Sequence, residues 1–157
     1  MPTEIERKFL VTDDTWRASA SAARIRQGYL YSDKRLGIRV RTVDDRAFLT
    51  IKGVKSGLVR AEYEYPIPVA DAEEMLALCA APLIDKTRYT LEHGGREWIV
   101  DVFAGENAGL IVAEVELEDA DDDVTLPPWA GREVTDDPRY LNANLGCHPY
   151  RAWSSAV

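Results

Sequence analysis

Thr-Glu-Ile-Glu-Arg-Lys-Phe-Leu-Val, residues 3–11, alternates charged and apolar side chains over most of its length. Successive side chains of an extended chain point to opposite faces, so Glu4, Glu6 and Lys8 share one face and apolar residues share the other. Arg7 departs from this pattern, because it is charged but falls on the apolar face, and we expect it at the surface or rim. The stretch therefore predicts a β-strand with one charged and one apolar face.

Similar short segments recur along the chain and are separated by turn-forming residues such as Asp44-Asp45. They predict eight strands, at about 3–11, 24–31, 36–43, 46–53, 58–67, 85–92, 96–103 and 110–119. Eight strands suffice to close a small barrel. Helices are expected at about 13–22 and 72–80, the second with a capping box of Asp71 and Glu74. Residues 138–157 predict a short terminal helix or plug.

Charged side chains fall on one face of nearly every predicted strand. The acids are Glu4, Glu6, Glu62, Glu64, Asp101, Glu114 and Glu116, and the bases are Lys8, Arg39, Arg41, Lys52, Arg60, Lys86 and Arg88. An open antiparallel sheet with its charges facing water would explain one such strand. Because the pattern repeats over seven strands, we favour a closed antiparallel barrel with a charged interior and helices packed outside, a mainly β member of the α+β class. Unpaired buried charges are very costly, so such an interior must hold water and ions.

The two kinds of charge suggest complementary roles in one site. Neighbouring carboxylates such as Glu4 and Glu6 repel each other, and a divalent cation removes that repulsion. Hard cations such as Mg²⁺ take oxygen ligands and share them with phosphates, while Arg binds two phosphate oxygens at once. Acids for a metal and bases for phosphate are the inventory of phosphoryl transfer.

These residues make the sequence resemble the CYTH or triphosphate tunnel metalloenzyme superfamily, in particular its short bacterial inorganic triphosphatases. The likeness starts with Glu4-x-Glu6-x-Lys8, which alone would be a weak signal. It continues in order through RQGYL (26–30), RVR (39–41), LTIKG (49–53), RAEYEYPIP (60–68), KTRY (86–89), WIVDVF (98–103), AEVEL (113–117), GREVT (131–135) and RYLN (139–142). Ten ordered segments with their charges in phase make the resemblance specific.

The resemblance implies a role for each charged residue. Glu4, Glu6 and Glu116 would hold the first metal, Mg²⁺ or Mn²⁺. Glu62, Glu64, Asp101 and Glu114 would serve a second metal or the attacking water. Lys8, Arg39, Arg41, Lys52, Lys86 and Arg88 would bind phosphates, with Arg60 in phase beside them. Tyr29 resembles a tyrosine near the tunnel of short bacterial members, although packing within its strand explains it equally well.

The resemblance implies a metal-dependent phosphohydrolase that cleaves a triphosphate, foremost inorganic tripolyphosphate to pyrophosphate and phosphate. Adenylate cyclases and thiamine-triphosphatases of the same superfamily remain alternatives, because the sequence does not reveal a pocket for a base or for thiamine. A non-catalytic polyphosphate- or nucleotide-binding protein ranks lower, since its metal carboxylates would be expected to be lost. All of the expected metal-binding carboxylates are present in this sequence.

Length, composition and charge limit the number of domains, the partners and the cellular compartment that we expect. The 157 residues predict a single domain, 1–157. The sequence contains no run of about 18 apolar residues, so we expect no membrane span. A net charge of −8 argues against nucleic acid as a partner. Cys79 and Cys147 form no metal or redox motif and fit the cytoplasm. His93 and His148 form no cluster for a zinc site, and the apolar outer faces leave room for a homodimer.

Overall fold

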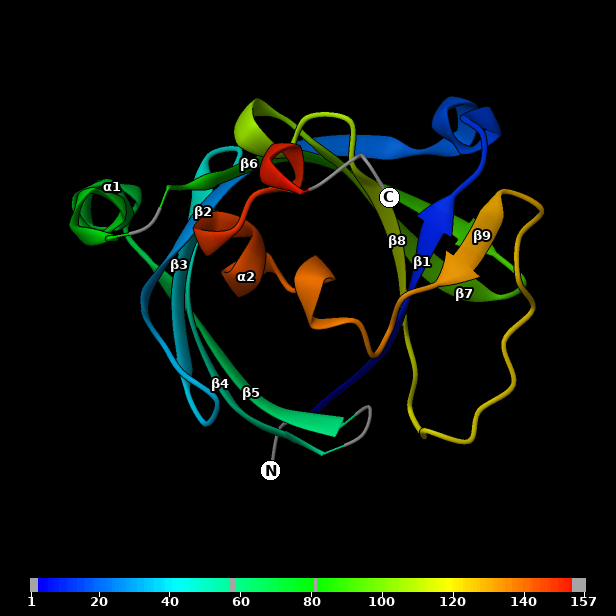
Figure 1. Ribbon diagram of the computed structural model, residues 1–157, viewed down its shortest axis with the longest axis horizontal. Coiled ribbons are helices and arrows are strands. Elements are labelled where there is room, and N and C mark those ends of the chain that lie inside the picture. The colour runs from blue at the N-terminus through cyan, green and yellow to red at the C-terminus, as the bar shows by residue number, and fades with distance from the viewer. Residues whose placement is uncertain (1–2, 57–58, 81, 154–157) are drawn as a thin grey trace.

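The strands of this chain close into an antiparallel barrel (Figure 1). The computed structural model describes residues 3–56, 59–80 and 82–153. Its strands are β1 Thr3–Val11, β2 Ser21–Ser32, β3 Gly37–Val43, β4 Arg46–Ser56, β5 Val59–Ile67, β6 Ile84–His93, β7 Arg96–Phe103, β8 Ile111–Glu116 and β9 Ala130–Glu133. Its helices are α1 Val69–Leu78 and α2 Asn142–Cys147, with 3₁₀ turns at Thr15–Ser19, Gly105–Asn107, Pro138–Tyr140 and Tyr150–Ala152. Residue 58 of a predicted strand and residues 154–157 of the predicted tail lie outside the described residues.

Eight strands form the barrel in the order β5-β4-β3-β2-β6-β7-β8-β1, and β1 closes it by pairing also with β5. On one side of the seam Glu4 lies opposite Arg60. On the other side Glu6 lies opposite Glu116, and Lys8 lies opposite Glu114. The predicted closed antiparallel barrel is confirmed, and the segment that suggested it forms the seam.

A ninth strand, β9, was not predicted. It pairs with β1 outside the closed ring, and Phe9 lies opposite Glu133. Arg7 binds the Glu133 carboxylate with two hydrogen bonds, of 3.0 Å from Nε and 2.7 Å from Nη2. A Cβ atom at Gly131 would lie 3.2 Å from the Leu10 carbonyl oxygen, so the close approach of β9 to β1 favours glycine. A four-residue strand containing glycine shows no alternating pattern that sequence reasoning could detect.

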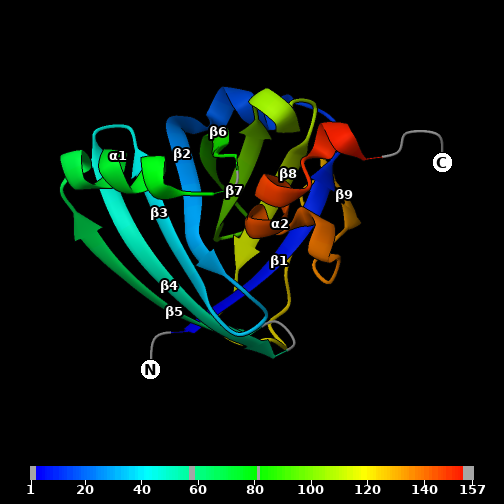
Figure 2. The same ribbon diagram turned by 60° about the vertical axis from the view of Figure 1, so that its left-hand side comes forward.

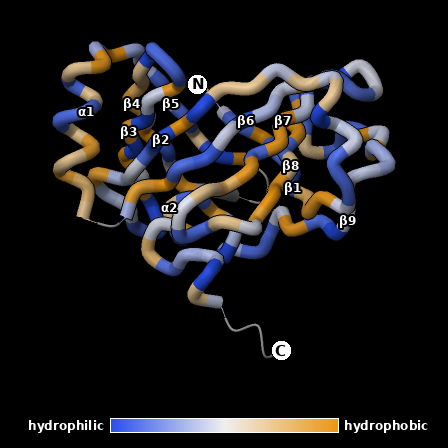
Figure 3. The backbone as a smooth tube through the Cα atoms, turned by 90° about the horizontal axis from the view of Figure 1, so that it is seen from above, coloured by the Kyte–Doolittle hydropathy of each residue, from blue (hydrophilic) through white to orange (hydrophobic). Residues whose placement is uncertain are grey.

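Apolar side chains form three clusters, two of which lie between the outer faces of the strands and the segments that cover them. The largest contains Phe9, Trp16, Trp98 and Trp129, with Trp98 entirely buried. A second contains Val40 and Leu76 and lies under α1, which packs on β2, β3 and β4. Hydrophobic stretches of β1, β7 and β8 are visible as orange segments in Figure 3. Because the apolar faces of the strands are used here, the charged faces are left for the interior.

The helix predicted over 13–22 was wrong. Only Thr15–Ser19 turns, as a 3₁₀ helix that buries Trp16, and β2 begins at Ser21, which lies opposite Thr90 of β6. Pairing with β6 outweighs the helical preference of the alanines in this stretch. The second predicted helix exists but starts earlier, at Val69 after Pro68, and no side chain caps its first turn. The predicted capping box is therefore absent.

The C-terminal segment crosses one mouth of the barrel, as Figures 1 and 2 show for α2. Tyr140 and Leu145 of this segment join the third apolar cluster with Ile84, Phe103 and Leu110. The expected terminal helix is present, and it lies at the mouth, whereas α1 packs on the outer wall. None of the helices within the described parts of the chain is long and apolar enough to cross a membrane.

Candidate active site

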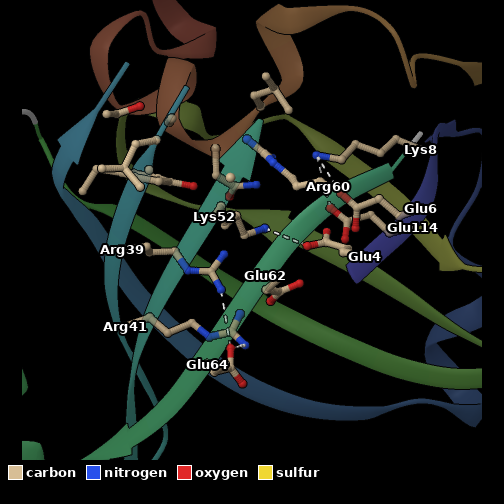
Figure 4. A pocket seen from close by; sticks show the side chains of 18 of the residues that line it. Glu4, Glu6, Lys8, Arg39, Arg41, Lys52, Arg60, Glu62, Glu64 and Glu114 are labelled. Carbon is tan, nitrogen blue, oxygen red and sulfur yellow. Dashed lines mark hydrogen bonds and ion pairs between the residues drawn. The ribbon is translucent and has the colours of Figure 1, made fainter. Parts of the chain in front are cut away.

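The barrel encloses a charged cavity with a volume of about 210 Å³ (Figure 4). Every predicted site residue except Asp101 lines it: Glu4, Glu6, Lys8, Tyr29, Arg39, Arg41, Lys52, Arg60, Glu62, Glu64, Lys86, Arg88, Glu114 and Glu116. They come from six strands, β1 to β6, together with β8. They converge because each lies on the inward face of its strand, at every second position.

Carboxylates crowd together where β1 meets β8. The register places Glu6 beside Glu116, with Glu114 on the same face of β8. Partial burial raises the pKa of Glu116, and the negative charges of Glu4 and Glu6 raise it further. The charged form is therefore disfavoured until a cation arrives.

The lysines on this side are paired with these carboxylates. Lys52 Nζ lies 3.1 Å from Glu4 Oε2, and Lys8 Nζ lies 3.7 Å from Glu6 and 3.6 Å from Glu114. Burial opposes the charge of Lys8, but Glu114 and Glu6 outweigh that effect and raise its pKa. Each of these lysines could leave a carboxylate and turn to an anion if a metal took its place.

The facing wall is built from guanidinium groups. Arg39 and Arg41 each approach the Glu64 carboxylate, at 3.7 Å and 3.3 Å, so one carboxylate serves two cations. Burial, and next the charges of Arg39 and Arg88, lowers the pKa of Arg41 to about 10. Among the described residues, the buried Nε atoms of Arg39, Arg41 and Arg60 have no hydrogen-bond partner. This wall has unused donors and excess positive charge, which suits a polyanion.

Asp101 lies behind the cavity surface and is 1% exposed. Arg88 donates to it from Nε and Nη2, both at 2.9 Å, and Lys86 Nζ lies 2.9 Å away. These cations hold its pKa well below the usual range against the effect of burial. Burial lowers the pKa of Lys86 to about 7. Among the described residues, the side-chain hydrogen bonds and ion pairs of Asp101 go to Lys86 and Arg88, so its geometry suits positioning these bases better than holding water or metal.

The cavity also has lining residues that sequence reasoning missed. Asn142, with Leu141 and Ala143, reaches it from the C-terminal segment, and Lys34 and Arg35 reach it from the β2–β3 turn. No periodic pattern marks these positions, although the last residue of the RYLN segment is Asn142.

A second, neighbouring pocket lies near the β6–β7 turn, where Glu97 and Glu118 join Glu6, Glu114 and Glu116. Glu97 could have been found, because it continues the inward alternation of Ile99 and Asp101 along β7. Tyr29 lines the main cavity and adds to the raised pKa of Lys8, which favours the tunnel interpretation of this residue over strand packing.

The donor set fits a hard divalent cation in its chemistry. It consists of neighbouring carboxylates, and burial together with the charges of Glu4 and Glu6 raises the pKa of Glu116. Within residues 3–56, 59–80 and 82–153, no three acidic, histidine or cysteine side chains meet in a ready-made metal site. Lys52 and Lys8 form ion pairs with these carboxylates instead. Binding a cation would therefore require one of the two lysines to move.

Comparisons with known proteins agree with this geometry. The sequence profile of the CYTH domain matches residues 2–143. An inorganic triphosphatase of Acetivibrio thermocellus is 49% identical over 152 residues, which cover 96% of this chain and 97% of that protein. An inorganic triphosphatase of Nitrosomonas europaea is 40% identical over 147 residues, covering 91% and 96%. A crystal structure of an inorganic triphosphatase superposes with a TM-score of 0.66 at 36% identity, covering 90% of this chain and 96% of that one.

Proposed function

The chain belongs to the CYTH domain family, as its sequence indicated, and on this premise we propose that it hydrolyses inorganic tripolyphosphate to pyrophosphate and phosphate. Two relatives that align over nearly their whole length are inorganic triphosphatases, and so is the solved structure that superposes on this barrel. One observation carries the proposal: a single cavity joins crowded carboxylates on β1 and β8 to arginines on β3 whose buried Nε atoms have no hydrogen-bond partner among the described residues.

Membership in this family implies a divalent metal ion, and we propose Mg²⁺ or Mn²⁺. Glu4, Glu6 and Glu116 would hold it, because they are the carboxylates whose mutual repulsion a cation relieves. When bound, such an ion neutralises charge on the phosphate chain and helps to orient it. Lys8 and Lys52, released from their carboxylates, would then face the phosphates.

The protein side chains supply the remaining functions. Arg39, Arg41 and Arg88 would each offer two donors to phosphate oxygens, and Lys86 and Arg60 would add further positive charge. Glu62, Glu64 and Glu114 line the same cavity and would hold the attacking water in line with the bond that breaks. Asp101 would act through Lys86 and Arg88, which it orients. Positioning of this kind is the main source of rate in phosphoryl transfer.

The decisive experiment measures phosphate release from tripolyphosphate, thiamine triphosphate and ATP with Mg²⁺ or Mn²⁺, and identifies the products. Tripolyphosphate should be turned over fastest, with one pyrophosphate formed for each phosphate. Cyclic AMP as the main product, or a preference for thiamine triphosphate, would support the alternative activities. Tight binding without turnover would make the protein a binding module.

Three variants test the site. Glu4→Ala, Glu6→Ala and Glu116→Ala should each lose most of the turnover, because water and phosphate lose their positions together. Glu73→Ala is the matched control, since Glu73 pairs with Arg26 on the outside of the barrel. Near-normal turnover by all three site variants would refute the assignment of the metal ligands.

We also propose a cytoplasmic location. Cys79 and Cys147 are both free thiols, which suits a reducing compartment.

A further inference from the structure

The C-terminal segment brings one amide side chain to the wall of the cavity. Val134 N donates to Lys8 O at 2.8 Å, which ties the start of this segment to β1. The chain then crosses the mouth, and Asn142 reaches the cavity between Leu141 and Ala143. The conformation of the C-terminal segment thus determines which of its side chains lines the cavity.

Several contacts fix this segment in place. Tyr140 and Leu145 are buried against Ile84 and Phe103 of the barrel. Further along, Tyr150 N donates to Asn107 Oδ1 at 2.8 Å, which joins the segment to the β7–β8 connection. Asn142 therefore belongs to a packed wall, and its side chain has a defined position.

The orientation of the Asn142 amide follows from its neighbour. Lys86 Nζ donates to Asn142 Oδ1 at 2.9 Å. In the ammonium form, which the neighbouring Asp101 favours, Lys86 has only donors, so the amide oxygen faces it. The Nδ2 group, with two N–H donors, is left for other partners. No described residue accepts from it.

Lys86 has a spare donor at the same place. Of its three N–H groups, one points to Asn142 and one to Asp101, at 2.9 Å each. Neither contact uses the third N–H group, and both Lys86 and Asn142 line the cavity, with Lys86 Nζ also 5.4 Å from the centre of the Phe103 ring. Two adjacent donors on a cavity wall, one of them charged, match two oxygens of one phosphate.

We propose that Asn142 is a substrate-binding residue whose Nδ2 donates to a phosphate oxygen while its Oδ1 holds Lys86 against the same phosphate. The inference rests on the proposed function, because it takes a phosphate chain as the ligand. It makes the C-terminal segment part of the substrate site and adds a neutral donor to a set of charged ones.

Two substitutions separate contact with substrate from a structural role. Asn142→Asp keeps the shape and the acceptor for Lys86, but it replaces the free donor by negative charge. We expect its KM for tripolyphosphate to rise more than about tenfold, with a smaller fall in kcat. Asn142→Ala removes both groups and should raise KM by about tenfold. Asn142→Ser serves as a third variant if either protein fails to fold, which thermal unfolding would reveal.

Asn144→Ala is the matched control. Asn144 lies in the same helix, is exposed, and donates from Nδ2 to Pro138 O at 2.7 Å, so its loss affects the segment but not the cavity. Its KM should stay within about twofold of wild type. An unchanged KM for Asn142→Asp, or an equal rise in Asn144→Ala, would overturn the inference.

A binding measurement separates this inference from the proposed function. Calorimetric titration of tripolyphosphate into the wild-type protein and Asn142→Asp reports binding without turnover. If wild-type protein binds tripolyphosphate but does not hydrolyse it, the proposed function fails, and weaker binding by Asn142→Asp still supports the role of Asn142. If wild-type protein hydrolyses it and both proteins bind equally, only the inference fails.

Discussion

Lys86 Nζ lies 2.9 Å from Asp101 Oδ2, and both side chains are only 1% exposed. Arg88 shares the same carboxylate, so one buried negative charge stands between two cations. Breaking a buried pair leaves an uncompensated charge away from water, which is far worse than losing an exposed pair. The cost of removing Asp101 should therefore appear in stability as well as in activity.

Asp101→Asn should lower the free energy of unfolding by about 3–5 kcal/mol, because Lys86 and Arg88 lose their shared counter-charge. Urea unfolding followed by tryptophan fluorescence measures this change. Asp85→Asn is the control, since Asp85 pairs with the exposed Arg24 and its loss should cost at most about 1 kcal/mol. Equal effects of the two substitutions would show that the Asp101 pair contributes nothing special.

Activity should rise with pH from mildly acidic values to an alkaline optimum. The pKa of Glu116 is raised by burial and by Glu4 and Glu6, so protons compete with the metal for this carboxylate above the ordinary glutamate range. Rate profiles at low and high Mg²⁺ test this directly. A higher Mg²⁺ concentration should move the acidic limb of the profile to lower pH. An acidic limb whose position does not change with Mg²⁺, or an optimum below pH 7, would contradict the prediction.

The outer pair of Arg7 and Glu133 should contribute modestly and only above acidic pH. The hydrogen bond from Arg7 lowers the pKa of Glu133 in the folded protein. The contribution is therefore present above the unfolded value and is lost as pH falls through the folded one. Because both side chains are partly exposed, a double-mutant cycle with Arg7→Ala and Glu133→Ala should give about 0.2–1 kcal/mol at neutral pH. A coupling that survives at pH 2 would disprove the ionic origin.

Gly28→Ala should destabilise the packing of α1 without harming the site. A Cβ atom at position 28 would lie 2.7 Å from Leu83 Cδ2 and 2.8 Å from Cys79 Sγ, on the outer face of β2. Overpacking of this kind costs about 1–3 kcal/mol. The double variant Gly28→Ala with Cys79→Ala should regain part of the loss, and kcat of the folded fraction should not change. Loss of kcat at unchanged stability would show that α1 influences the tunnel.

Alternation along the strands predicted the barrel and most of the cavity, because a two-residue period decides which side chains face inward. Glu4, Arg39 and Glu114 all lie on the cavity for this reason. The same period made Asp101 look like its neighbours, yet it is covered by Lys86 and Arg88. Periodicity predicts which face of a strand a side chain occupies. It does not predict whether longer neighbouring side chains cover it.

The features that were not predicted depend on contacts between distant segments. Nothing local distinguishes residues 130–133 as a strand, since β9 exists only where β1 offers an edge. Asn142 reaches the cavity because Tyr140 and Leu145 find an apolar surface on the barrel. Residues 13–22 looked helical by composition, but the pairing of Ser21 with Thr90 extends β2 into them.

The seam made by β1 has a consequence for biosynthesis. Strand β1, which carries Glu4, Glu6 and Lys8, leaves the ribosome before its partners β5, β8 and β9, and more than 90 residues separate it from β8. Contacts between segments so far apart in sequence form late and slowly. The nascent chain must therefore keep an unpaired strand edge without aggregating until β8 has been translated, and no truncated product that ends before β8 can assemble the metal ligands.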